Sequence, residues 1–105
     1  MERKLNISKM PQGHGIDKAI VTNLIERSYD KLNQRMQGEL LMEVHFKEFH
    51  KSGTKEEVEV KVRAVIAGFS FHADARDWSA EKAAKTALVA IEKEAQRAIE
   101  KKKLR

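Results

Sequence analysis

The sequence contains no cysteine, only one proline and few aromatic residues, which make up 6% of its 105 residues. Without thiols the chain can form neither a disulfide nor a thiolate zinc site, and it offers no cysteine nucleophile. Its uninterrupted apolar runs are only a few residues long, so none of them suffices for a membrane-spanning helix. The first residues alternate charged and apolar groups, which is not the pattern of a signal peptide. The absences therefore exclude several classes of protein before any motif is considered.

What is present is the composition of a compact soluble domain, with 35% charged and 41% hydrophobic residues. A chain of this length forms one hydrophobic core, so we expect a single domain over residues 1–105, with a basic tail at about 101–105. The lack of cysteine suits a reducing compartment, and we expect a cytoplasmic protein. The formal net charge of +5 favours an anionic partner, and nucleic acid is the commonest of these.

The spacing of apolar residues divides the chain into strands and helices. Alternation of apolar and polar residues, typical of a strand with one buried face, occurs in four segments: Leu5–Ile7, Leu40–Lys47, Glu57–Ile66 and Phe69–Ala75. Spacings of three and four residues, typical of an amphipathic helix, occur in two segments: Ile16–Met36 and Ala80–Lys101. The expected apolar stripe of the first helix is Ile20, Val21, Leu24, Ile25, Tyr29, Leu32 and Met36.

This pattern predicts an α+β fold, a two-layer sandwich with the order β-α-β-β-β-α. The four-stranded sheet can bury its apolar residues only if both helices pack on the same face, which leaves the other face, mixed in charge, in water. Short links between the last three strands predict an antiparallel meander. Ser79 is a suitable N-cap for the last helix, with Trp78 placed to pack on Ala83 as a hydrophobic staple.

The charges are segregated along the chain. Residues 1–36 carry 7 basic and 4 acidic groups, residues 37–78 carry 6 and 8, and residues 79–105 carry 8 and 4. The two helical segments are therefore positive and the sheet segment is negative. Because both helices belong to one layer, we expect the positive charge to gather on that side of the sandwich.

Basic residues form a row on each helix. Arg27, Lys31 and Arg35 recur every four residues on the first, and Lys93, Arg97 and Lys101 do so on the second, with Lys82 close to its line and Glu92 on another flank. Successive members of such a row rise by about 6 Å, close to the spacing of phosphates along a nucleic-acid strand. The rows therefore predict phosphate binding. The alternative is that these side chains only keep the helix surfaces soluble.

The chain offers no arrangement typical of a catalytic or metal site. Its four histidines, His14, His45, His50 and His72, do not have the spacing of a ligand set. No nucleophile has an evident neighbouring base. We therefore expect a protein that is not an enzyme and that needs no metal and no cofactor.

Four segments resemble one known family. They are Leu5–Ser8 as an opening strand, Tyr29–Leu32 near the end of the first helix, Met42–Phe46 as the second strand, and Phe71–Ala75 leading into a capped helix. In these segments and in their order the chain is similar to the ribosome hibernation-promoting factors and ribosome-associated inhibitors, once called sigma-54 modulation proteins. It departs from them in a longer loop before the first helix, and in Glu81 where an aromatic residue is usual.

The resemblance implies a function. Members of this family bind rRNA in the decoding region of the small ribosomal subunit, through basic residues of the helical layer, and silence translation under stress. Lys31, Lys93 and Arg97 match basic positions of the family, whereas Arg27, Arg35, Lys82 and Lys101 follow only from their helical spacing. Longer members add a dimerising domain, so the short chain implies a monomer. No membrane partner is expected.

Two other functions compete with this one. The segment Glu81–Val89 also resembles the last helix of double-stranded-RNA-binding domains, which share an α-β-β-β-α core. The extra strand Leu5–Ile7 and the lack of a Gly-Pro-x-His loop argue against that interpretation. The third alternative is a protein-binding module that uses the edge or the open face of the sheet.

Overall fold

The computed structural model describes residues 4–10, 18–35, 40–50, 56–66 and 68–102, except for the side chains at positions 50, 56, 99, 101 and 102. The elements follow the expected order: β1 (Leu5–Ser8), α1 (Lys18–Arg35), β2 (Leu40–His50), β3 (Glu56–Ile66), β4 (Phe69–Asp77) and α2 (Ala80–Lys102). The α+β class and the β-α-β-β-β-α order are thus confirmed. The second strand is longer than predicted, reaching His50, and the expected loop at 51–54 lies outside the described residues.

The strands form one sheet in the order β1-β2-β3-β4. The expected meander is present, because β3 pairs antiparallel with both β2 and β4. β1 lies parallel to β2, with Leu5 opposite Met42, so the chain between them crosses over through α1. Gly68 takes a left-handed φ of 84° between β3 and β4, a conformation that favours glycine.

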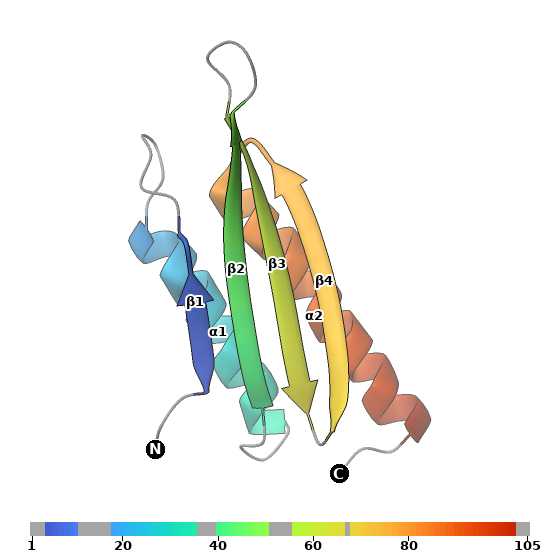
Figure 1. Ribbon diagram of the computed structural model, residues 1–105. Helices are drawn as coiled ribbons and strands as arrows, with labels where there is room; N and C mark the ends of the chain where they lie inside the picture. The colour runs from blue at the N-terminus through green and yellow to red at the C-terminus, as the bar shows by residue number, and fades with distance from the viewer. Residues whose placement is uncertain (1–3, 11–17, 36–39, 51–55, 67, 103–105) are drawn as a thin grey trace.

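Both helices cover the same face of the sheet (Figure 1). α1 lies behind β1 and β2, and α2 crosses behind β3 and β4. The core between the layers contains the inward side chains of β2 and β3, including Leu40, Val44 and Val60, each at most 1% exposed. α2 contributes mainly small residues, since Ala84 and Ala87 are fully buried. Small side chains let this helix approach the sheet closely.

Tyr29 ties α1 to two strands through one buried hydroxyl group. The oxygen accepts a hydrogen bond from the backbone N–H of Lys4 at 2.9 Å, and the hydroxyl donates to the carbonyl oxygen of Leu40 at 3.3 Å. The Leu40 N–H in turn donates to Oδ1 of Asn33 at 3.2 Å. The end of α1 is therefore fixed to the starts of both β1 and β2 by polar groups that would otherwise be buried without partners.

The start of α2 agrees with the sequence in its cap. Ser79 caps the helix, because its Oγ accepts a hydrogen bond from the Lys82 N–H at 3.2 Å. Trp78, expected to pack as a staple on Ala83, is 54% exposed. β4 ends at Asp77 and Trp78 follows it in the bend before the helix, so its packing on Ala83 stays a prediction.

The apolar stripe of α1 is also narrower than predicted. Val21, Ile25, Tyr29 and Leu32 are buried, but Ile20 is 46% exposed. At about 100° per residue, Ile20 lies well away from the direction shared by Ile25 and Leu32, so it cannot face the sheet with them. Met36, also assigned to the stripe, lies outside the described residues.

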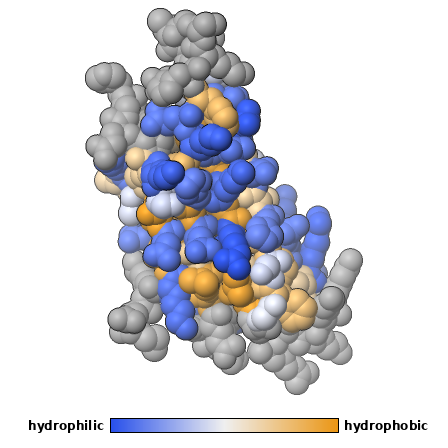
Figure 2. All heavy atoms as spheres, in the orientation of Figure 1, coloured by the Kyte–Doolittle hydropathy of each residue, from blue (hydrophilic) through white to orange (hydrophobic). Residues whose placement is uncertain are grey.

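The face of the sheet opposite the helices is open and mostly hydrophilic (Figure 2). Cross-strand pairs balance much of its charge. Arg63 lies 2.7 Å from Glu43, and Arg76 lies 3.4 Å from Glu59. The Arg76 guanidinium also stacks on the ring of Phe49, 4.1 Å from its centre. Opposite charges thus alternate over this face, as the sequence predicted.

Candidate nucleic-acid interface

The two helices lie side by side, and a groove runs between them on the outer surface of the helical layer. Its first hollow is lined from α1 by Leu24, Arg27, Ser28 and Lys31, and from α2 by Lys85, Leu88, Val89 and Glu92. A second hollow, which shares Val89 and Glu92 with the first, continues along α2 past Lys93, Gln96 and Arg97. We call this continuous surface the interhelical groove.

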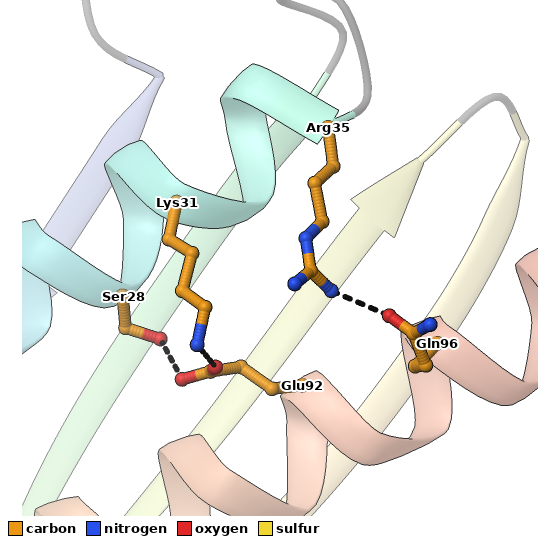
Figure 3. A network of polar contacts seen from close by, with 5 residues as sticks. All are labelled: Ser28, Lys31, Arg35, Glu92 and Gln96. Atoms are coloured by element: carbon orange, nitrogen blue, oxygen red, sulfur yellow. Dashed lines mark hydrogen bonds and ion pairs between the residues drawn. The ribbon is translucent and has the colours of Figure 1, made fainter.

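A carboxylate joins the helices at the middle of the groove (Figure 3). Oε1 of Glu92 lies 3.0 Å from Nζ of Lys31, and Oε2 accepts a hydrogen bond from the Ser28 hydroxyl at 3.0 Å. Ser28 is the one buried polar residue among the described side chains, at 6% exposure. The Glu92 carboxylate therefore satisfies a buried hydroxyl group and neutralises one lysine of the groove.

One turn further along, Arg35 donates a hydrogen bond to Oε1 of Gln96 (Figure 3). The amide of Gln96 also donates to Glu100 at 3.2 Å. The guanidinium of Arg35 is thus held over the groove by a neutral partner and keeps its full charge. The carboxylate at this end of the groove, Glu100, is bound to Gln96 and, among the described contacts, makes no ion pair with Arg35 itself.

The structure brings most of the predicted phosphate-binding residues to this groove. Arg27, Lys31 and Arg35 lie on the side of α1 that faces α2, and Lys93 and Arg97 line the second hollow. Lys82 lies in the first turn of α2 and lines neither hollow. Lys101 belongs to α2, but its side chain is outside the described residues. The row of α1 therefore lies beside α2, whereas Lys93 and Arg97 lie on the adjoining hollow, whose described lining comes from α2 alone.

Sequence reasoning missed two residues of the groove. Lys85 lines the first hollow, although no row predicted from spacing contains it. Glu92 was expected on a flank away from the row of Lys93 and Arg97, and the structure turns that flank toward α1. Lys85 and Glu92 are seven residues apart, so they lie on the same side of the helix. Both could have been identified only from knowing which side of α2 packs against α1.

The charge of the groove is strongly positive. Its two hollows are lined by five cationic side chains and one carboxylate, and a sixth cation, Arg35, is held beside them by Gln96: the lining residues are Arg27, Lys31, Lys85, Lys93, Arg97 and Glu92. The Lys31 side chain is 57% exposed even while it pairs with Glu92. Such charges are accessible to an incoming polyanion, and exposed ion pairs of this kind are weak enough to exchange partners. No three metal-ligating side chains gather anywhere in the part of the chain that the structure describes.

Over the described residues, neither helix is both long and apolar enough to span a bilayer. The outward surface of the helical layer is instead basic, as the groove shows.

Comparison with solved structures gives two neighbours of the same fold. The N-terminal domain of Thermus thermophilus Protein Y superposes with a TM-score of 0.65 and 18% sequence identity, over 89% of this chain and 92% of that one. A ribosomal subunit interface protein from Coxiella burnetii superposes with a TM-score of 0.51 and 15% identity, over 92% and 96%. No protein-family model and no curated protein matches the sequence. The resemblance drawn from the sequence is thus confirmed in the architecture: the chain has the fold of Protein Y and of a ribosomal subunit interface protein.

Proposed function

We propose that the chain is a non-catalytic translation inhibitor of the ribosome-hibernation type, which binds small-subunit rRNA in the decoding region through its interhelical groove. The observation that carries the proposal is the groove itself, where cationic side chains from two helices converge on one surface. A neighbour of the same fold is described as a ribosomal subunit interface protein, which supports the ribosome as the site of action. The motifs that resemble hibernation factors support it independently.

The groove suits a folded RNA rather than a particular base sequence. Lysine and arginine side chains bind phosphate oxygens, which position a protein on its target but do not read bases. Structured RNA is recognised largely by shape and by its backbone. The basic rows on the two helices would follow RNA phosphates along the groove. In this proposal the whole chain acts as one ribosome-binding domain in the cytoplasm.

Two features of the fold favour the ribosome over a free RNA duplex as the target. β1 extends the sheet beyond the α-β-β-β-α core of double-stranded-RNA-binding domains and pairs in parallel with β2. The neighbours that cover nearly all of this chain contain the same complete architecture. A duplex-binding module is the alternative against which the proposal is tested.

Co-sedimentation with purified small ribosomal subunits tests the proposal. We expect the chain to pellet with subunits at low salt and to be released as salt rises, because phosphate binding displaces counterions from the RNA and added salt reverses that displacement. Lack of pelleting at both low and moderate salt would contradict ribosome binding. Tighter binding to a naked RNA duplex than to subunits would instead select the duplex-binding alternative.

Two double variants test which face of the protein binds the subunit. Lys93→Glu with Arg97→Glu reverses two charges of the groove, and Lys47→Glu with Lys61→Glu reverses two exposed charges of the sheet. Both pairs change the net charge equally. We expect only the groove pair to abolish pelleting at moderate salt. Equal losses in the two pairs would show that total charge, rather than the groove, determines binding.

A further inference from the structure

The sheet has one long open edge. Of its two edge strands, β1 has 4 residues and β4 has 9. β4 pairs with β3 in unbroken register, from Phe69 opposite Ile66 to Asp77 opposite Val58. It contains no proline, glycine, lysine or bulge, which are among the devices that block an edge against further pairing, and its charged side chains are Asp74, Arg76 and Asp77. Its outer backbone groups are therefore arranged to pair with another strand.

We propose that this edge pairs with β4 of a second copy of the chain, antiparallel about a two-fold axis at Ala73. When two sheets join in this way, residues opposite each other must belong to the same face. The outer face of β4 presents Ser70, His72, Asp74 and Arg76, and the helical face presents Phe69, Phe71, Ala73 and Ala75. Because the two strands are identical and antiparallel, the residue on the two-fold axis determines which residues of β4 lie opposite each other.

Charge complementarity selects the register. Centred on Ala73, the pairing places His72 opposite Asp74 of the second copy, and by symmetry Asp74 opposite His72. An imidazole N–H can donate to a carboxylate in each of these pairs. Opposite pairs of this kind stabilise neighbouring strands, whereas like charges directly opposite each other destabilise them.

The neighbouring registers lack this complementarity. Centring on Asp74 brings two carboxylates together and sets His72 opposite Arg76. Centring on His72 sets the imidazole opposite itself and Asp74 opposite Ser70, so neither pair joins opposite charges. Centring on Ala75 would set Asp74 opposite Arg76, but Arg76 is already held by Glu57 at 3.6 Å and by Glu59 at 3.4 Å. Ala73 is therefore the centre that uses side chains not already paired among the described residues of one copy.

On the helical face the same register sets Phe69 opposite Asp77 at the ends of the strand. Closer to the axis it sets the large side chain of Phe71, which is only partly buried in one copy, opposite the small side chain of Ala75. The C-terminal end of α2 projects beyond the β4 edge (Figure 1). In the pair it would lie beneath the sheet of the other copy, so that a helix as well as a strand contributes to the interface.

The resulting dimer has a continuous sheet with both helical layers on one side. The two interhelical grooves then face the same direction, which would give a polyanion two points of attachment. The monomer expected from the chain length is replaced in this inference by a symmetric pair. The inference goes beyond RNA binding and does not depend on it, because no residue of the groove takes part.

A cysteine placed on the two-fold axis tests the pairing directly, because the natural chain contains none. Opposite residues of antiparallel strands have Cα atoms about 4.5 to 5.5 Å apart, within disulfide range. We expect Ala73→Cys to form a covalent dimer under mild oxidation. Ala75→Cys is the matched control on the same face, and its two copies would lie roughly 13 Å apart in this register. Cross-linking of Ala75→Cys but not Ala73→Cys would overturn the pairing.

Sedimentation velocity of the unmodified chain, without RNA, gives the second test. We expect reversible dimerisation that His72→Asp weakens at least fivefold, because the substitution sets two carboxylates opposite each other on either side of the axis. The exchanged variant, His72→Asp with Asp74→His, restores opposite pairs and should restore the dimer. A natural chain that stays monomeric at millimolar concentration would overturn the inference, as would a dimer that His72→Asp leaves unchanged. Neither result bears on pelleting with ribosomal subunits.

Discussion

The Lys31 ammonium group and the Glu92 carboxylate lie 3.0 Å apart across the groove between the two helices. The pair joins α1 to α2, and it also occupies one cation of the surface that we propose for RNA binding. A phosphate approaching Lys31 must therefore compete with a carboxylate that belongs to the protein itself. This competition leads to the first prediction.

Replacing Glu92 by Gln should strengthen binding to small ribosomal subunits. The amide can still accept the hydrogen bond from Ser28, but it no longer neutralises Lys31 or repels phosphates. Interactions of exposed charges amount to about 0.5–1 kcal/mol, so we expect affinity to rise roughly two- to fivefold at moderate salt. Titration of labelled protein with subunits measures the change.

Glu94→Gln is the matched control for this change. Glu94 is exposed on the same helix but lines neither hollow of the groove. The two variants have the same net charge. An equal gain in affinity from both would show that overall charge, and not the position of Glu92, is responsible.

The elements were predictable because they depend on local periodicity. Alternation placed Val44 and Val60 in the core, and the small side chains of Ala84 and Ala87 indicated a helix close to the sheet. The position of Glu92 was not predictable in this way. Its partner Lys31 is far away in the sequence, and only the packing of one helix against the other brings them together.

Ile20, which was predicted to belong to the buried stripe, shows the same dependence on packing between elements. Ile20 is apolar and fits the spacing of three and four residues that is typical of a helix, but it points away from the buried side chains of the stripe. Spacing alone does not exclude a residue that deviates in this way. Trp78 stands between the strand that ends at Asp77 and the helix that begins at Ala80, and it is 54% exposed. Residues at the junction of two elements belong to two patterns at once, and the sequence does not say which one prevails.

Lys85 provides the second prediction, because the structure adds it to the groove. Lys85→Ala should lower the slope of log affinity against log salt by about 0.7 to 0.9, the change expected when the protein neutralises one phosphate fewer. Alanine favours the helix, so the fold should be unaffected. Lys82→Ala is the comparison, since Lys82 lies outside both hollows. If Lys82→Ala lowers the slope and Lys85→Ala does not, the groove has been placed at the wrong end of α2.

Tyr29 provides the third prediction, which concerns the connection of α1 to the sheet. Tyr29→Phe keeps the buried ring but removes the hydroxyl that bridges Lys4 and Leu40. Two backbone groups lose a partner, so we expect a loss of about 1–3 kcal/mol in the free energy of unfolding. Urea denaturation measures this loss. A midpoint equal to that of the natural chain would mean that water replaces the hydroxyl without cost.

The close approach of α2 to the sheet provides the last prediction. Ala84 is fully buried in the core between the helix and the sheet, so Ala84→Leu must displace either the helix or its neighbours. Overpacking of this kind costs about 1–3 kcal/mol. Ala90, on the same helix but only partly buried, offers a control, because Ala90→Leu adds the same atoms where solvent can accommodate them. Thermal unfolding of the two variants should therefore differ by several degrees. Equal melting temperatures would show that α2 can move away from the sheet freely, and that its alanines are not what sets the distance between the layers.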